Sequence, residues 1–355
     1  PLAANAETSW FGFSQITAET AATSDGNNEG LTFGADRIRI GYKASEGPAF
    51  AKLQVDFLQT GVADNGMPGV IKDAVVGYEL APAAKISLGQ FKTPVGMDFN
   101  TSGKKLDITK RGMEKGLVLE RAAGAMVSGD LDGGFGYDVG VFNPTTRSNV
   151  VSTENGVDAA GNAGGTGEDM AMAGRVRYDM DNLHLQFSYG MSPNAGGANS
   201  STSTSLAIDN TGPDPVLVEE TNIDNGNQDT EDYTVMDFGA KYTMDPLTLK
   251  FEYIAGSNLN GVDGRDETVM FVHGGYMISD STELVARHYM GTHDDENGNE
   301  TDLTNTYLGA NFFLNDAMRI QANYVMTGGD NEGQSSVTRD KYYDDAILTQ
   351  FQYMF

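Results

Sequence analysis

Apolar and polar residues alternate with a period of two in segments spread along the whole chain. The segment 37–43 alternates isoleucine or tyrosine with arginine or lysine, and 51–57, 183–189, 247–253 and 318–324 alternate in the same way. Because successive side chains of a strand point to opposite faces, these segments are predicted to be β-strands with one apolar and one polar face. No stretch keeps a helical period over more than two turns.

The connections between these strands also alternate, between short and long. Short turns rich in Gly, Pro, Asn and Asp stand at 45–48, 81–83, 132–134, 179–182, 245–246, 279–280 and 315–316. Long polar segments stand at 19–30, 60–69, 94–116, 143–169, 192–232, 257–267, 292–303 and 328–341. Fifteen connections join sixteen strands. We therefore predict a single domain over 1–355: a closed 16-stranded antiparallel transmembrane β-barrel with short periplasmic turns and long extracellular loops.

The composition agrees with a barrel better than with a soluble fold. Only 39% of the 355 residues are apolar, and no apolar run approaches the ~18 residues of a transmembrane helix. A closed barrel satisfies every backbone group and turns only alternate residues to lipid, so a low apolar content suffices. The alternative is a soluble β-sandwich or β-solenoid. Its core would not normally leave so many polar residues on the opposite face of nearly every strand in a chain with 44 glycines.

Charge and residue usage exclude several functions. The chain holds 50 acidic and 23 basic residues, for a net charge of −27, which would repel a nucleic acid. Without cysteine there is no disulfide framework, zinc ribbon or thiol nucleophile. A barrel hydrolase would need a nucleophile beside a histidine base, and none of the four histidines stands in such a context. We expect no enzyme activity and no cofactor. The four histidines are His184, His273, His288 and His293.

Most of the acidity lies in the long segments. Asp294, Asp295 and Glu296 form the densest group of oxygen ligands, although the spacing is not that of an EF-hand. These acids are a candidate site for Ca²⁺ or Mg²⁺, which would bridge the loops to lipopolysaccharide phosphates. The alternative is that they only solvate the loops. The segment 192–232, rich in Asn, Ser, Gly and Asp, is predicted to be a surface loop.

The two ends of the chain carry possible signals. Ala4-Asn5-Ala6 fits the small-x-small pattern of a signal-peptidase site, so 1–6 is either a remnant of processing or an N-terminal extension. The last six residues alternate and end on Phe355. This end resembles the terminal strand of bacterial outer-membrane proteins, whose final aromatic residue is an assembly signal.

The third long segment, 94–116, is the basic exception, and the strand before it carries Gly-Gln-Phe-Lys-Thr-Pro-Val-Gly at 89–96. At this stretch the chain resembles Gram-negative outer-membrane porins, most of all the phosphate-selective porin O/P family. The resemblance implies a homotrimer whose third loop folds inward and narrows each pore. The implied constriction candidates are Lys104, Lys105, Lys110, Arg111 and Lys115. Each of them either lines the pore or pairs with an acid.

The polar faces of the strands supply further candidates for the pore wall. These are Arg37, Arg39, Lys43, Lys52, Asp56, Arg175, Arg177, Lys250 and Arg319. Charged rings at a constriction set ion selectivity, so the expected function is passive diffusion of small hydrophilic solutes and ions, with anions such as phosphate as the candidate preference. The alternative is a structural or adhesive barrel with a plugged lumen, whose acidic loops bind a partner.

Overall fold

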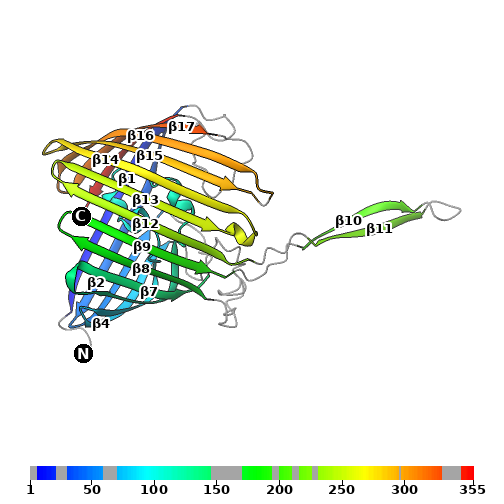
Figure 1. Cartoon of the computed structure of the whole chain (residues 1–355), viewed down its shortest axis with the longest axis horizontal. Coiled ribbons are helices and arrows are strands. Elements are labelled where there is room, and N and C mark those ends of the chain that lie inside the picture. Colours follow the sequence, from blue (N-terminus) through cyan, green and yellow to red (C-terminus); the bar gives the residue numbers. More distant parts are fainter. Residues whose placement is uncertain are drawn as a thin grey trace.

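The structure, a computed structural model, describes residues 6–20, 30–58, 70–144, 170–193, 200–209, 216–225, 231–295, 297–329 and 345–355. Within these residues sixteen strands form one closed antiparallel barrel, in which β1 pairs with β18 to complete the ring (Figure 1). The barrel strands are β1 Glu7–Thr20, β2 Leu31–Glu46, β3 Ala49–Asp56, β4 Ile71–Ala81, β5 Ala84–Lys92, β6 Arg121–Asp130, β7 Phe135–Phe142, β8 Ala171–Met180, β9 Leu183–Ser192, β12 Tyr233–Met244, β13 Leu247–Ser257, β14 Asp266–Ser279, β15 Thr282–Asp294, β16 Glu300–Asn315, β17 Met318–Gly329 and β18 Ala346–Met354. The predicted fold is confirmed.

The connections follow the predicted alternation. Each of the seven predicted short turns joins two neighbouring strands, and each of the eight long segments joins the opposite ends. The short turns gather at one end of the barrel, where β1 also begins and β18 ends (Figure 1). We call this the short-turn end and the other the long-loop end.

The two faces of the barrel wall have opposite polarity. On β9, Phe187 and Tyr189 are about half exposed on the outside, whereas Gln186 and Ser188 are buried inside. Asp138 of β7 and Asp237 of β12 are likewise buried on the inner face. An apolar outside and a polar inside suit a barrel whose wall stands in lipid. Among the described residues no helix is long and apolar enough to cross a membrane.

Two strands lie outside the ring and were not predicted. β10 Ser200–Asp209 and β11 Val216–Asn225 pair as a separate two-stranded sheet within the segment predicted to be a surface loop. The alternation in these strands is mostly between polar residues, so it carries no apolar stripe to reveal them. The remaining elements are short: α1 Met97–Asn100, η1 Gly103–Lys105, η2 Met113–Gly116, η3 Asp132–Gly134 and η5 Leu259–Gly261.

An apolar core lies inside the barrel, not between layers. Residues 93–120, which we call the inner loop, run from β5 to β6 and bury Val95, Leu117 and Val118 completely. These side chains belong to one cluster with wall residues such as Tyr233 and Ile254. The inner loop is therefore packed against the inside of the wall.

Candidate functional site

The neck of the inner loop is closed by hydrogen bonds. Thr93 donates from its backbone N (2.9 Å) and its Oγ1 (3.0 Å) to the carbonyl oxygen of Glu120. Gly96 then turns the chain at φ +83°, and a Cβ there would lie 2.7 Å from Val118 Cγ1. Only glycine meets both conditions without strain. The turn sends the following residues, including α1, across the lumen.

A carboxylate on the opposite wall holds α1. Glu252 of β13 accepts the backbone N–H of Met97 (2.9 Å) and of Asp98 (2.8 Å), one on each carboxylate oxygen. The Gly96 N–H reaches Ser188 Oγ on β9 at 3.3 Å. The first N–H groups of a helix have no partner within the helix, so these wall oxygens satisfy them. The start of the inner loop is thus fastened to β9 and β13.

Ion pairs fasten the middle of the inner loop. Asp107 accepts Lys250 Nζ at 2.5 Å and Arg287 Nη2 at 3.0 Å. Arg287 also lies 3.3 Å from Asp98, and both of these side chains are 1% exposed. Although burial alone would raise it, the charges of Lys250 and Arg287 hold the pKa of Asp107 well below its usual range.

Other polar wall side chains bind the backbone of the same stretch. Arg319 (2.9 Å) and Gln321 (3.1 Å) donate to the carbonyl oxygen of Leu106. Asn323 accepts the Thr109 N–H at 2.9 Å. The further contacts of this kind are Asn311 to Asp107, Gln350 to Thr109, Gln15 to Gly103 and Gln352 to Lys104. The inner loop therefore lies along β13, β15–β18 and β1. Towards β2–β6 it leaves open space, apart from the contacts of Lys110 with Asp36 and of Lys92 with loop carbonyls.

The five cations predicted in this loop have different surroundings. Lys104 and Lys105 border cavities. Lys110 pairs with Glu19 of β1 and lies 3.4 Å from Asp36 of β2. Arg111 donates to the carbonyl oxygens of Asp98, Phe99 and Thr101. Lys115 lies 3.3 Å from Glu120, and both side chains are largely exposed.

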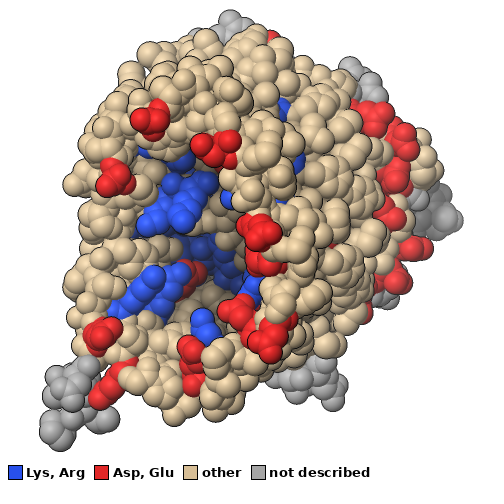
Figure 2. All heavy atoms as spheres, turned by 60° about the vertical axis from the view of Figure 1, so that its left-hand side comes forward, with Lys and Arg blue, Asp and Glu red and all other residues tan. Residues whose placement is uncertain are grey.

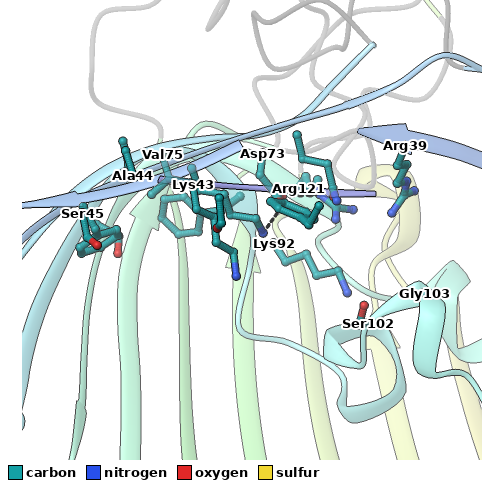
Figure 3. A pocket seen from close by; sticks show the side chains of 18 of the residues that line it. Arg39, Lys43, Ala44, Ser45, Asp73, Val75, Lys92, Ser102, Gly103 and Arg121 are labelled. Atoms are coloured by element: carbon teal, nitrogen blue, oxygen red, sulfur yellow. Dashed lines mark hydrogen bonds and ion pairs between the residues drawn. The ribbon is translucent and has the colours of Figure 1, made fainter. Parts of the chain in front are cut away.

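The open space is a cavity of about 840 Å³ between the inner loop and strands β1–β6. Among the described residues, seven cationic side chains line it against two acidic ones, Glu7 and Asp73. The seven are Arg39, Lys43, Lys52, Lys85, Lys92, Lys104 and Arg121. Figure 2 shows lysine and arginine gathered in this hollow at the short-turn end, with acidic side chains around the rim. In Figure 3, Arg39, Lys92 and Arg121 lie across from Ser102 and Gly103 of the inner loop.

The other predicted wall residues lie on the inner face, and most are bonded. Asp56 accepts Arg39 at 2.8 Å, Lys52 lies 2.5 Å from Asp73, and Arg37 donates to Gln15 at 2.7 Å. Arg175 and Arg177 share Asp138 on the neighbouring strand. Lys250 and Arg319, as described above, hold the inner loop. Lys43 has its ammonium above the ring of Phe11.

Sequence reasoning missed Lys85, Lys92 and Arg121 of the cavity wall. Lys92 stands in the Gly-Gln-Phe-Lys stretch, directly opposite Arg121 in the β5–β6 register. Its ammonium donates to the carbonyl oxygens of Phe99 and Thr101. The alternation of inward- and outward-facing positions along β5 and β6 could have identified these residues. On β5 the regular alternation is interrupted at Gly89, whose φ is +120°, and this obscured the pattern.

Two further cavities border the tip of the inner loop. One, of about 480 Å³, is lined by Lys105, Arg175, Lys241 and Lys250 together with Asp98 and Asp107. The other, of about 630 Å³, is lined by Lys104, Lys105 and Arg319 with four acidic residues. The tip is therefore surrounded by open volume.

The remaining candidates lie apart from the lumen cavities. Asp295 accepts hydrogen bonds from Asn297 and Asn299 at 2.8 Å, and Glu296 lies outside the described residues. Over the described ranges no three His, Asp or Glu side chains are grouped for a metal. Phe355 pairs with Gly12 of β1 through two backbone hydrogen bonds, and its ring is 60% exposed. Residues 1–5 are not described.

Comparison with known proteins identifies a family whose model matches this sequence. A family model described as Gram-negative porin matches residues 1–334. A loop L8 deletion mutant of OmpT, an outer membrane protein of Vibrio cholerae, is 13% identical with a TM-score of 0.66 over 99% of both chains. An anion-selective porin from Comamonas acidovorans is 11% identical with a TM-score of 0.66, covering 99% of this chain and 100% of that one. OmpF of Salmonella typhi in complex with daunomycin is 13% identical with a TM-score of 0.67, covering 98% and 97%. These likenesses show the fold, and no curated protein matches the sequence.

Proposed function

Because the chain belongs to the Gram-negative porin family of bacterial outer-membrane channels, we propose that it is a channel that conducts small anions preferentially, through a pore that the inner loop narrows. The observation that carries the proposal is the charge of the 840 Å³ cavity, where seven cations face two acids. A cleft lined by one sign of charge raises the local concentration of counter-ions. Anions therefore enter it more readily than cations.

The net charge of the chain does not reverse this preference. The excess of acids, −27 over the whole chain, lies mostly in the long loops and at the rims. Exposed charges are screened beyond about 8 Å at physiological ionic strength. Passing ions meet the lumen cations at shorter range, so the cavity governs selectivity.

Two lysines of the inner loop have the placement that a constriction requires. Lys104 borders the basic cavity and Lys105 borders both smaller ones. Within the described residues neither forms an ion pair with a carboxylate. In contrast, Lys110 forms an ion pair with Glu19, and Arg111 donates hydrogen bonds to loop carbonyl oxygens. We assign Lys104 and Lys105 to selection and the other two to fastening the loop.

Single-channel recording in a planar bilayer tests the proposal. Under a KCl gradient the reversal potential should have the sign of chloride selectivity. The double variant Lys104→Gln/Lys105→Gln should shift it toward the value for a non-selective pore. Lys115→Gln removes one positive charge of the inner loop outside these cavities and should not change it. Cation selectivity of the unaltered channel would refute the anion preference. No conductance from folded, inserted protein would favour the adhesive barrel instead.

We further propose a homotrimer. One solved structure of Vibrio cholerae OmpT that resembles this chain is described as a trimer form. Conductance steps in groups of three, with a matching mass of the detergent-solubilised complex, would support this assembly. A monomeric mass with single steps would exclude it.

A further inference from the structure

Two phenyl rings lie flat on the inner wall of the basic cavity, near the short-turn end. Phe11 of β1 stands directly opposite Gly41 of β2, and Phe50 of β3 stands opposite Gly77 of β4. A Cβ at Gly41 would lie 2.3 Å from Phe11 Cζ, and one at Gly77 would lie 2.1 Å from Phe50 Cζ. The rings thus occupy the space that a side chain would fill, which only glycine permits.

A lysine ammonium stands by each of these rings. Lys43 Nζ lies 5.2 Å from the centroid of Phe11, and Lys85 Nζ lies 4.7 Å from the centroid of Phe50. Across the described residues neither lysine forms an ion pair with a carboxylate. Lys52, between them on the wall, pairs with Asp73. Each pair, Phe11 with Lys43 and Phe50 with Lys85, therefore presents a phenyl ring beside an ammonium group that forms no ion pair within the described residues.

This combination is selective in a way that charge alone is not. An inorganic anion gains from the ammonium groups but nothing from two phenyl rings. A flat organic ring gains both apolar burial and aromatic contact from either of them. Its carboxylate groups then meet the lysine beside that ring. Lys104 of the inner loop borders the same cavity and adds a third cation.

We propose that the two ring–ammonium pairs of this cavity, Phe11 with Lys43 and Phe50 with Lys85, form a subsite in which either pair can bind an organic anion that carries a flat aromatic ring, of the aryl carboxylate class. The inference rests on the proposed anion channel, through which such a solute reaches the subsite, and it narrows the solute to a chemical class. The rings hold the apolar body against the wall, and the ammonium groups of Lys43 and Lys85 hold the carboxylates. The subsite lies on the short-turn side of the inner loop.

Block of the chloride current by two trianions tests the class. Benzene-1,3,5-tricarboxylate and propane-1,2,3-tricarboxylate, compared at pH 8, carry the same charge and differ in the ring. We expect the aromatic anion to block at about a five- to tenfold lower concentration. Block should be stronger from the short-turn side. Equal block by the two anions would overturn the subsite while leaving the anion channel intact.

Variants assign the effect to residues. In Phe11→Leu and in Phe50→Leu the concentration ratio between the two anions should fall toward one. Lys85→Gln should weaken block by both anions and leave their ratio unchanged. Phe187→Leu, the same substitution on the outer face of β9, serves as the control. An unchanged ratio in both folded phenylalanine variants would refute the assignment, and either variant suffices if the other does not fold.

A binding measurement separates this inference from the proposed function. Calorimetric titration of the folded protein in detergent with each trianion needs no conductance. Tighter binding of the aromatic anion, lost in Phe50→Leu, would support the subsite even if no current were observed. Equal affinities in a conducting, anion-selective channel would refute only the subsite.

Discussion

Asp107 and Glu114 are acids of the same inner loop, yet the barrel wall gives them opposite surroundings. Asp107 meets Lys250 and Arg287, whose charges keep it ionised. Glu114 is fully buried, and neither of its carboxylate oxygens has a hydrogen-bond partner among the described residues. Burial and the nearby Asp98 carboxylate raise the pKa of Glu114 to about 7. The two residues therefore make stability depend on pH in opposite directions.

Replacing Glu114 by Gln should remove one of these dependences. A carboxyl with a pKa above its ordinary value of 4.5 binds more protons in the folded barrel than in the unfolded chain. Its contribution is fully present below about pH 4.5 and is lost as the pH rises through 7. The variant should match the parent near pH 4.5 and exceed it by about 1–3 kcal/mol at pH 9. Tm measured against pH in detergent checks this, and parallel curves would contradict it.

Replacing Asp107 by Asn should loosen the inner loop. The carboxylate has a lowered pKa, so its stabilising contribution is present above its ordinary value of 3.8 and declines at lower pH. Removing Asp107 leaves Lys250 without its carboxylate and Arg287 with Asp98 alone, at a cost of about 3 kcal/mol. We expect a lower Tm at pH 7 and greater open-channel current noise. Asp132→Asn, on an exposed turn, is the control and should change neither quantity.

At the scale of elements, the inner loop depends on one backbone turn. Gly96 combines φ +83° with close contact to Val118, and it directs α1 to Glu252. The short turn at Gly47 also has a positive φ, of +56°, but nothing lies within 4 Å of a Cβ there. A substitution at Gly47 would therefore cause backbone strain alone, whereas one at Gly96 would cause both backbone strain and a steric clash.

Gly96→Ala should therefore cost more than Gly47→Ala. Both substitutions place a side chain at positive φ, at about 1 kcal/mol. Only the first also forces Val118 or α1 to move, adding about 1–3 kcal/mol. We expect a larger loss of Tm for Gly96→Ala, together with a changed conductance. Equal losses, or an unchanged conductance in Gly96→Ala, would show that the turn does not position the loop.

At the scale of the whole molecule, barrel closure is independent of the longest connection. β9 and β12 pair directly, with Ser192 opposite Tyr233 at the long-loop end. The hydrogen-bonded ring is thus complete without 193–232. The inner loop differs, because it binds strands around much of the inner wall.

Replacing 194–231 by a short Gly-Ser linker should leave a folded, conducting barrel. Single-channel conductance and Tm are the measurements, and we expect both to stay close to those of the parent. Replacing the inner-loop residues 95–118 in the same way should lower Tm and raise conductance. Loss of conductance after the first replacement would contradict the prediction that the pore does not need 194–231. Loss of a bound partner would favour the adhesive barrel.

The architecture of this protein could be predicted from its amino-acid sequence alone. Alternation and turn chemistry are local properties, so sixteen strands, seven short turns and eight long connections could all be located from neighbouring residues. The β10–β11 pair was missed because its strands show no apolar stripe.

Only the tertiary structure decided which cations surround the cavity and which fasten the inner loop. Lys110 meets Glu19 and Lys250 meets Asp107, pairs that are 91 and 143 residues apart in the chain. Lys85 and Lys43 come beside phenyl rings because particular glycines face those rings across the strand register. Such neighbours depend on the closure of the barrel. No periodicity within one strand can report what stands across the lumen.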